Sequence, residues 1–346
     1  MIKPWIFEFL YAPADHDGEA ARQAPTVVYD RGLALWKRLD ELDFEGIFFS
    51  EHHFGLSYSP SPNLLIAAVA RSTKRLRLGT MGVVLPLYQP WRVLEEIGML
   101  DHLTGGRLEI GCASGVPQEL IQTGIGPEEN RERFDETLQI LDAWLAEPVI
   151  SHHGRYYNFD SLRVVPRPLQ QPSPPKWTTV VSTSSATKSA ARRSRICTAF
   201  ESVARIKEIF DAYRSEADRL GFACGPDHLA IRRNVSIAVS ETEAKERSQM
   251  AREMAAKVLA GDPRVLQQSS SLLDAPKRGS GFSVHADEFI AGTPAQVAEQ
   301  IIAQCRQVGA RHFLAILGRA VDDHRIRAVE LFAEQVIPAL RRAEVS

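Results

Sequence analysis

Short apolar runs alternate with amphipathic stretches along the whole chain of 346 residues. Continuous apolar runs of roughly four to eight residues are typical of buried parallel strands, whereas apolar positions that recur every three or four residues indicate helices. The pattern predicts strands at residues 6–10, 46–49, 76–85, 107–111, 177–182, 195–200, 229–239 and 312–317. It predicts helices at residues 25–42, 63–70, 91–103, 131–145, 184–193, 203–220, 244–259, 293–308 and 325–340.

Eight strands that alternate with helices predict an α/β fold, a (β/α)8 TIM barrel with insertions, as a single domain over residues 1–346. A doubly wound open sheet is the alternative, but such sheets usually have fewer strands. Two segments break the alternation. Residues 149–168 predict a small hairpin insertion, and residues 261–287 are long and irregular, as expected of a lid loop over an active site.

A carboxylate and two histidines follow one of the predicted strands directly. The apolar run that begins at Gly46 and ends at Phe49 leads through a serine into Glu51, His52 and His53. Ligands of parallel α/β proteins bind at the carboxyl ends of the strands, so these side chains lie where chemistry is expected. Neighbouring strand residues point to opposite faces, which makes two metal ligands from this pair unexpected. One imidazole could exchange a proton near pH 7, with a purely structural histidine as the alternative.

Three further strand ends carry unusual residues. Gly82 interrupts a β-branched run, which indicates close approach of the backbone to a ligand or, equally, a packing glycine. The small residues at 111–115 leave room for a ligand but form no dinucleotide fingerprint. Residues 182–187, with the sequence Ser-Thr-Ser-Ser-Ala-Thr, open a predicted helix. Their hydroxyls exceed what a helix cap needs and favour an anion site, although capping alone is the simpler interpretation.

Composition narrows the class of protein. The net charge of -2 and the pI of about 6.6 give no basic face for nucleic acid. Four cysteines without a CxxC pair predict reduced thiols and a cytoplasmic location, and neither a signal-peptide core nor a membrane-spanning run is evident. A metal hydrolase is a weak alternative, because no HExxH spacing occurs and His152 and His153 are expected to be solvated loop residues. No metal is therefore expected.

Several motifs taken together resemble the bacterial luciferase-like monooxygenases, a flavin-dependent barrel family. The resemblance extends over nearly the whole chain and is strongest at the Phe-Phe-Ser-Glu-His-His-Phe stretch, residues 48–54. The other matching segments are residues 75–80, 84–86, 90–96, 100–101, 105–111, 132–134, 154–157, 166–168 and 292–294.

The resemblance implies reduced FMN at the carboxyl end of the barrel. It implies His52 as the catalytic histidine that assists proton transfer, and a non-prolyl cis peptide between Met81 and Gly82 against the flavin ring. It places the FMN phosphate on the hydroxyl-rich segment, through Ser182, Thr183, Ser184, Ser185 and Thr187.

Two positions depart from the family pattern. Ser114 stands where an arginine often lies near the phosphate, and the phosphate segment is rich in hydroxyls rather than glycine. Neutral donors and the helix dipole, worth about 0.3–1 kcal/mol, must then hold the anion.

The resulting hypothesis is an FMN-dependent monooxygenase that uses reduced flavin and O2 to oxidise a small organic substrate. A separate flavin reductase would supply the reduced FMN, and the family resemblance suggests a homodimer. A deazaflavin-dependent oxidoreductase on the same scaffold and a non-catalytic flavin-binding or cofactor-free barrel are the alternatives. The substrate is not named by the sequence. Residues 117–125 and 261–287, which are expected to select it, carry no recognisable motif.

Overall fold

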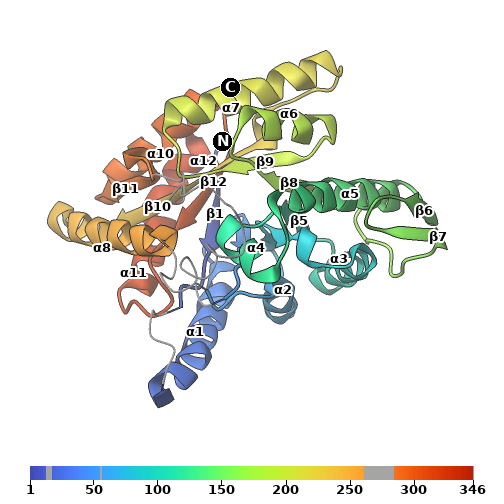
Figure 1. The fold of residues 1–346 in the computed structure, drawn as a ribbon. Coiled ribbons are helices and arrows are strands. Elements are labelled where there is room, and N and C mark those ends of the chain that lie inside the picture. The colour runs from blue at the N-terminus through green and yellow to red at the C-terminus, as the bar shows by residue number, and fades with distance from the viewer. Residues whose placement is uncertain (13–17, 55–56, 261–283, 346) are drawn as a thin grey trace.

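Eight parallel strands form the centre of the molecule. The computed structural model describes residues 1–12, 18–54, 57–260 and 284–345. Within these residues the strands follow the order β1-β2-β3-β5-β8-β9-β10-β12, and β12 pairs with β1 to close the ring. Helices lie between successive strands and surround the barrel (Figure 1). The closed ring confirms the predicted (β/α)8 fold and excludes an open sheet.

Most elements lie close to their predicted positions. The barrel strands are β1 (Lys3–Glu8), β2 (Gly46–Phe49), β3 (Arg77–Thr80), β5 (Leu108–Ala113), β8 (Lys176–Thr179), β9 (Arg195–Thr198), β10 (Leu229–Ile237) and β12 (His312–Ile316). The helices are α1 (Gly18–Leu39), α2 (Pro62–Ala70), α3 (Pro90–Thr104), α4 (Pro117–Thr123), α5 (Pro127–Ala146), α6 (Thr183–Ala191), α7 (Val203–Arg219), α8 (Glu241–Ala260), α10 (Pro294–Val308), α11 (Arg325–Leu331) and α12 (Ile337–Arg342). A π-helical turn, η4 (Phe332–Val336), joins the last two helices.

Large aromatic side chains fill the amino-terminal half of the barrel. Trp5, Phe48 and Trp177 are fully buried, and their ring centroids lie 4.7 Å and 5.5 Å apart in succession. Beside them the buried Glu109 accepts a hydrogen bond from the Trp177 indole at 2.6 Å and pairs with Arg77. Because large side chains pack this part of the barrel, we expect a ligand to enter from the carboxyl end of the strands.

One helix and one strand of the described residues were not predicted. Helix α4 occupies most of residues 117–125, which the sequence pattern left as a loop. Strand β11 (Phe289–Gly292) pairs with the last residues of β10, beyond its partners in the barrel. A short 3-10 turn, η3 (Ala286–Glu288), precedes β11. Most of the expected lid at 261–287 lies outside the described residues, since these resume at residue 284.

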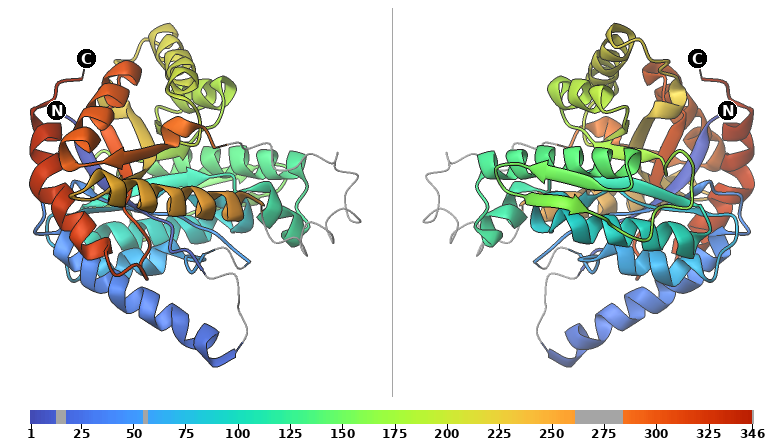
Figure 2. Two further views of the ribbon diagram at one scale, coloured as in Figure 1. Left: turned by 90° about the vertical axis from the view of Figure 1, so that its left-hand side faces the viewer. Right: turned by 90° about the vertical axis from the view of Figure 1, so that its right-hand side faces the viewer.

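The segment at 149–168 contains an antiparallel hairpin of β6 (Ile150–His153) and β7 (Asn158–Leu162), which lies next to α5 (Figures 1 and 2). The buried Glu136 of α5 accepts the backbone N–H of Tyr157 at 2.9 Å and contacts His152 Nε2 at 3.0 Å. The prediction that His152 is a solvated loop residue was therefore wrong, because this imidazole anchors the hairpin. His153 is exposed and pairs with Asp160 at 3.0 Å, at the end of a strand and not in a loop.

Neither a metal centre nor a membrane helix is found in the part of the chain that the structure describes. No group of three or more His, Cys, Asp or Glu side chains within these ranges is placed to hold a metal ion. In the same residues, no helix combines the length and the apolar character needed to cross a bilayer.

Candidate active site

His52 leaves the barrel directly after β2 and lies in a small aromatic and acidic environment. Its backbone N–H donates to the carbonyl of Ser59 at 3.1 Å, which fixes the turn that follows the strand. Its ring packs on Phe9, which follows β1, with 4.4 Å between the centroids. Its Nδ1 lies 2.8 Å from Oε1 of Glu119, and the imidazole is 19% exposed. His52 is thus held at the mouth of the barrel with part of its ring accessible.

Glu119 comes from α4 and is almost completely buried. Its side chain is 3% exposed, and its second oxygen, Oε2, has no hydrogen-bond partner among the described residues. A carboxylate on one nitrogen of an imidazole fixes the ring orientation and the tautomer. Sequence reasoning missed Glu119, which lies 67 positions from His52. The available signal was a proline followed by an acidic residue, which is typical of the first turn of a helix.

Glu51 and His53 form a separate network that holds the end of β2 in place. The buried Glu51 carboxylate contacts His53 Nε2 at 2.9 Å and accepts the Tyr88 hydroxyl at 3.1 Å and the Val84 N–H at 3.2 Å. The hydrogen bond to Glu51 raises the pKa of His53. These contacts tie β2 to the segment that follows β3 and leave His52 as the histidine that faces Glu119.

Met81 and Gly82 separate β3 from the short strand β4 (Val83–Val84), and the peptide bond between them is cis, as the resemblance implies. Met81 is buried with the aromatic residues of the barrel interior. A Cβ atom on Gly82 would lie 2.7 Å from the backbone N and C of Cys112 on β5. Close packing of β4 on β5 therefore accounts for the absence of a side chain at this position, and contact of the Gly82 backbone with a ligand stays a prediction.

The hydroxyl-rich segment forms the amino terminus of α6. Ser182 is the N-cap and accepts the N–H of Ser185 at 3.2 Å, while the Ser185 hydroxyl accepts the N–H of Ser182 at 3.1 Å. The Thr187 hydroxyl donates to the carbonyl of Thr183 at 3.0 Å. Three of the five hydroxyls are thus used by the helix itself, as the capping interpretation expects.

The hydroxyls of Thr183 and Ser184 make no hydrogen bond to another described residue, and Ser184 is exposed. The first N–H groups of a helix also lack partners within the helix and carry positive charge from its dipole. Lys188 and Arg192, the nearby cations, bind the carboxylates of Asp135 and Asp142 on α5. This terminus therefore offers neutral donors to an anion.

Ser114 and the amino terminus of α6 follow two strands that are neighbours in the barrel. It follows β5, whose Cys112 pairs with Thr178 of β8, and β8 leads into α6. Both segments thus leave adjacent strands on the carboxyl face of the barrel. The donor set can hold a phosphate, and the half-buried Ser114 adds another hydroxyl where an arginine was expected.

Comparison with known proteins agrees with this architecture. The family model of the luciferase-like monooxygenases matches residues 9–312. An uncharacterized protein, y4wF of Sinorhizobium fredii, is 36% identical over 244 residues, which cover 69% of this chain and 68% of that protein. The oxygenase component of a flavin-dependent trigonelline monooxygenase from Acinetobacter baylyi is 33% identical over 161 residues, but the match covers only 45% of this chain and 44% of the relative.

A solved structure shows the same fold over the whole chain. It is the oxygenating constituent of 3,6-diketocamphane monooxygenase from Pseudomonas putida, a type II Baeyer-Villiger enzyme in complex with FMN. The TM-score is 0.76 at 20% identity, with 100% of this chain and 99% of the other covered. The match to the family model over most of the chain confirms the resemblance inferred from the sequence motifs, and the protein belongs to the luciferase-like monooxygenase family.

Proposed function

We propose that this protein is an FMN-dependent monooxygenase that uses reduced flavin and O2 to oxidise a small organic substrate. The observation that carries the proposal is the pair of His52 and the buried Glu119 at the carboxyl end of the barrel, 2.8 Å apart. A buried carboxylate that orients an accessible imidazole is typical of a group that moves protons. The family membership and the flavin-dependent relative from Acinetobacter baylyi support the flavin.

The residues present fit the phosphate of FMN. In the proposal, the N–H groups at the start of α6 and the hydroxyls of Thr183 and Ser184 bind the phosphate, with Ser114 beside them. Ser182, Ser185 and Thr187 shape this terminus through their own hydrogen bonds. Met81 and the backbone of Gly82 would form the surface that holds the flavin ring.

Bound reduced FMN supplies the electrons for the activation of O2. His52 would carry a proton at Nε2 toward the reacting oxygen, while Glu119 holds the ring in place through Nδ1. The aromatic side chains inside the barrel, with Phe9 at its mouth, exclude water from the reaction.

The reduced flavin comes from a separate reductase in this proposal. The relative from Acinetobacter baylyi is named as the oxygenase component of its system, which supports such a division. The neutral donors at α6 agree with a flavin that binds and leaves, because none of them brings a full positive charge to the phosphate.

A homodimer is part of the proposal, and apolar side chains on α2 and α3 support it. These helices lie side by side (Figure 1). Leu64 on α2 is 71% exposed, and Trp91 and Met99 on α3 are 43% and 51% exposed. Large exposed apolar side chains on two helices that pack together suit an interface between two copies of the protein. Light scattering on the purified protein is expected to give twice the monomer mass, and the Met99→Glu variant to give a monomer.

Anaerobic titration of the purified protein with reduced FMN, oxidised FMN and a reduced deazaflavin tests the cofactor. We expect reduced FMN to bind at micromolar concentration and more tightly than the deazaflavin. Tighter binding of the deazaflavin would support a hydride-transferring oxidoreductase in place of a monooxygenase. Absence of binding of any of the three at high micromolar concentration would refute the proposal and leave a cofactor-free barrel.

A further inference from the structure

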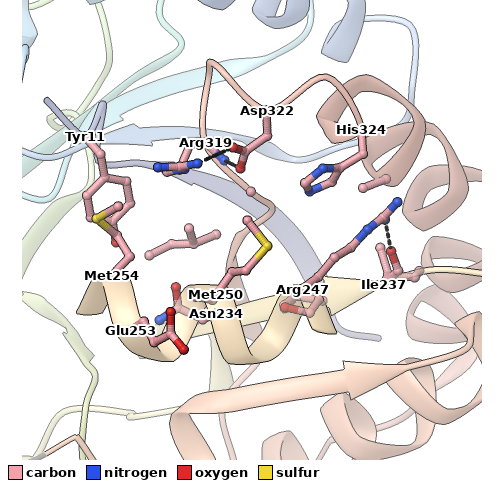
Figure 3. Close-up of a pocket in the computed structure, with 16 residues that line it drawn as sticks. Tyr11, Asn234, Ile237, Arg247, Met250, Glu253, Met254, Arg319, Asp322 and His324 are labelled. Carbon is pink, nitrogen blue, oxygen red and sulfur yellow. Dashed lines mark hydrogen bonds and ion pairs between the residues drawn. The ribbon is translucent and has the colours of Figure 1, made fainter. Parts of the chain in front are cut away.

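A cavity of about 220 Å³ lies at the ends of β1, β10 and β12 and beneath α8. Tyr11, which follows β1, forms one wall, and the turn that carries Arg319 forms another (Figure 3). Met250 and Met254 project from α8 into the space between them (Figure 3). The cavity thus opens on the same face of the barrel as His52.

The cavity lies across the barrel mouth from the proposed phosphate site. In the closed order of strands, β1 is four positions from β8, directly opposite the strand that leads into α6. A flavin whose phosphate lay at α6 would therefore have room to extend across the mouth toward this cavity. A substrate in the cavity would meet the flavin ring from the side remote from the phosphate.

A chain of rings connects the cavity to His52. Tyr11 lines the cavity and stacks on Phe9 with 4.3 Å between centroids, and Phe9 packs on His52 at 4.4 Å. Burial raises the pKa of Tyr11, which keeps its hydroxyl protonated and able to donate at neutral pH. The cavity wall and the proposed proton carrier are therefore two ring contacts apart.

The charged side chains of the cavity already have partners. Arg319 Nε and Nη2 bind the Oδ1 of Asp322 at 3.0 Å and 2.7 Å. Arg247 donates to the carbonyl of Ile237 at 2.6 Å and pairs with Glu243 on its own helix.

The remaining titratable groups of the lining are Glu253 and His324. Glu253 accepts a hydrogen bond from Gln249 at 2.9 Å. Burial lowers the pKa of His324, which keeps its imidazole neutral near pH 7. Both cations of the wall are already paired with carboxylates, Arg319 with Asp322 and Arg247 with Glu243, so an anionic ligand would find no counter-charge left for it, and burying an unpaired charge is costly.

Most of the rest of the lining is apolar, and the two polar residues in it are Ser236 and Asn234, whose amide donates to Glu288 at 2.9 Å. Two methionines face the space with Val235, Ile316 and two alanines, Ala251 and Ala328. Thioether side chains adapt to irregular ligands and contact rings favourably. A dry apolar cavity of about 150 Å³ is enough for benzene, so about 220 Å³ suits a single substituted ring and not a polycyclic or long-chain molecule.

We propose that this cavity is the substrate pocket and that it takes an uncharged monocyclic compound, to whose oxygen the Tyr11 hydroxyl donates a hydrogen bond. The inference rests on the proposed function for the reaction, but the pocket and its preference for neutral ligands can be measured without turnover.

Two matched pairs of probes test the charge preference. NMR titrations compare cyclohexanone with cyclohexanecarboxylate, and acetophenone with benzoate. We expect each ketone to bind at least about tenfold more tightly than its carboxylate partner. The Asp322→Asn variant releases Arg319 and is expected to tighten benzoate binding at least about fivefold. Equal affinities within both pairs, or no binding of either ketone, would overturn the proposal.

Two alanines of α8 provide a matched test of location. Ala251 lines the cavity, whereas Ala256 is exposed on the same helix and does not line it. Ala251→Phe fills the cavity and is expected to weaken ketone binding at least about tenfold, whereas Ala256→Phe leaves it unchanged. Equal ketone affinities in the two variants would refute the location.

Titration of both variants with FMN separates the substrate pocket from the flavin site. We expect equal FMN affinity in the two. If Ala251→Phe weakens FMN as much as it weakens the ketones, the cavity belongs to the flavin and the proposal fails. Ketone binding without FMN binding would instead refute the proposed function and leave the pocket standing.

Discussion

Replacement of Glu119 with glutamine tests the proposed proton-transfer pair most sharply, because it keeps the size of the side chain and removes its charge. The carboxylate is 3% exposed and lies 2.8 Å from His52 Nδ1. A hydrogen bond to a charged group contributes about 1.5–3 kcal/mol, and each 1.4 kcal/mol changes a rate tenfold. If the pair stabilises the protonated imidazole during the reaction, Glu119→Gln slows the proton-dependent step by one to two orders of magnitude.

The assay is stopped-flow mixing of the protein–reduced FMN complex with oxygenated buffer, followed by flavin absorbance. Glu128→Gln is the matched control, since Glu128 lies exposed in the first turn of α5. We expect this control to react at the wild-type rate. FMN affinity, measured separately, is expected to be the same in both variants, because Glu119 acts through His52.

A double-mutant cycle separates a positioning role from a general loss of structure. Glu119→Gln is expected to slow reoxidation in the wild-type background and to have no effect in the His52→Ala background, which gives a coupling of about 1.5–3 kcal/mol. Equal effects in the two backgrounds would show that Glu119 acts independently of His52 and would refute the reasoning.

Three further predictions concern other parts of the barrel. Ser184→Ala is expected to weaken FMN binding about three- to tenfold while leaving riboflavin, which lacks the phosphate, unchanged in the same titration; equal losses for both ligands would contradict the phosphate site. Gly82→Ala is expected to lower the free energy of unfolding by about 1–3 kcal/mol in urea denaturation, since its Cβ would meet the backbone of Cys112 at 2.7 Å, whereas Gly225→Ala, with open space around it, is expected to cost little. Burial lowers the pKa of His312 to about 4, so the unfolded chain binds one more proton than the folded protein between pH 4 and about 6.5. The free energy of unfolding is therefore expected to decrease as the pH is lowered from about 6.5 to 4, and more steeply in the wild type than in His312→Gln, by at most about 1.4 kcal/mol per pH unit. Parallel stability curves for the two proteins would contradict this prediction.

The periodic elements could be predicted because local patterns encode them. Gly46–Phe49 is bounded as expected, since a continuous apolar run has few alternatives to a buried strand. The polar triplet after it was recognised because strand ends carry ligands in this class of fold. Helices α1 and α5 begin several residues before their predicted starts, because a polar first turn contributes little to the hydrophobic periodicity.

Contacts across the barrel could not be read from the chain. Glu119 meets His52 only because α4 folds back over the mouth, and nothing in the local sequence marks that approach. The same holds for Tyr11, which reaches a cavity built from β10, β12 and α8. Gly82 is a related case. The sequence shows that a glycine is unusual at this position, but it does not show that the glycine packs against β5.

A crystal structure of the protein soaked with FMN tests the central claim most directly. The account predicts the phosphate at the start of α6, within hydrogen-bond distance of Thr183 and Ser184, and the flavin ring against Met81 with His52 beside it. The cavity lined by Tyr11 and Met254 is expected to stay free of the flavin. A phosphate bound away from α6, or a flavin ring inside that cavity, would contradict the account.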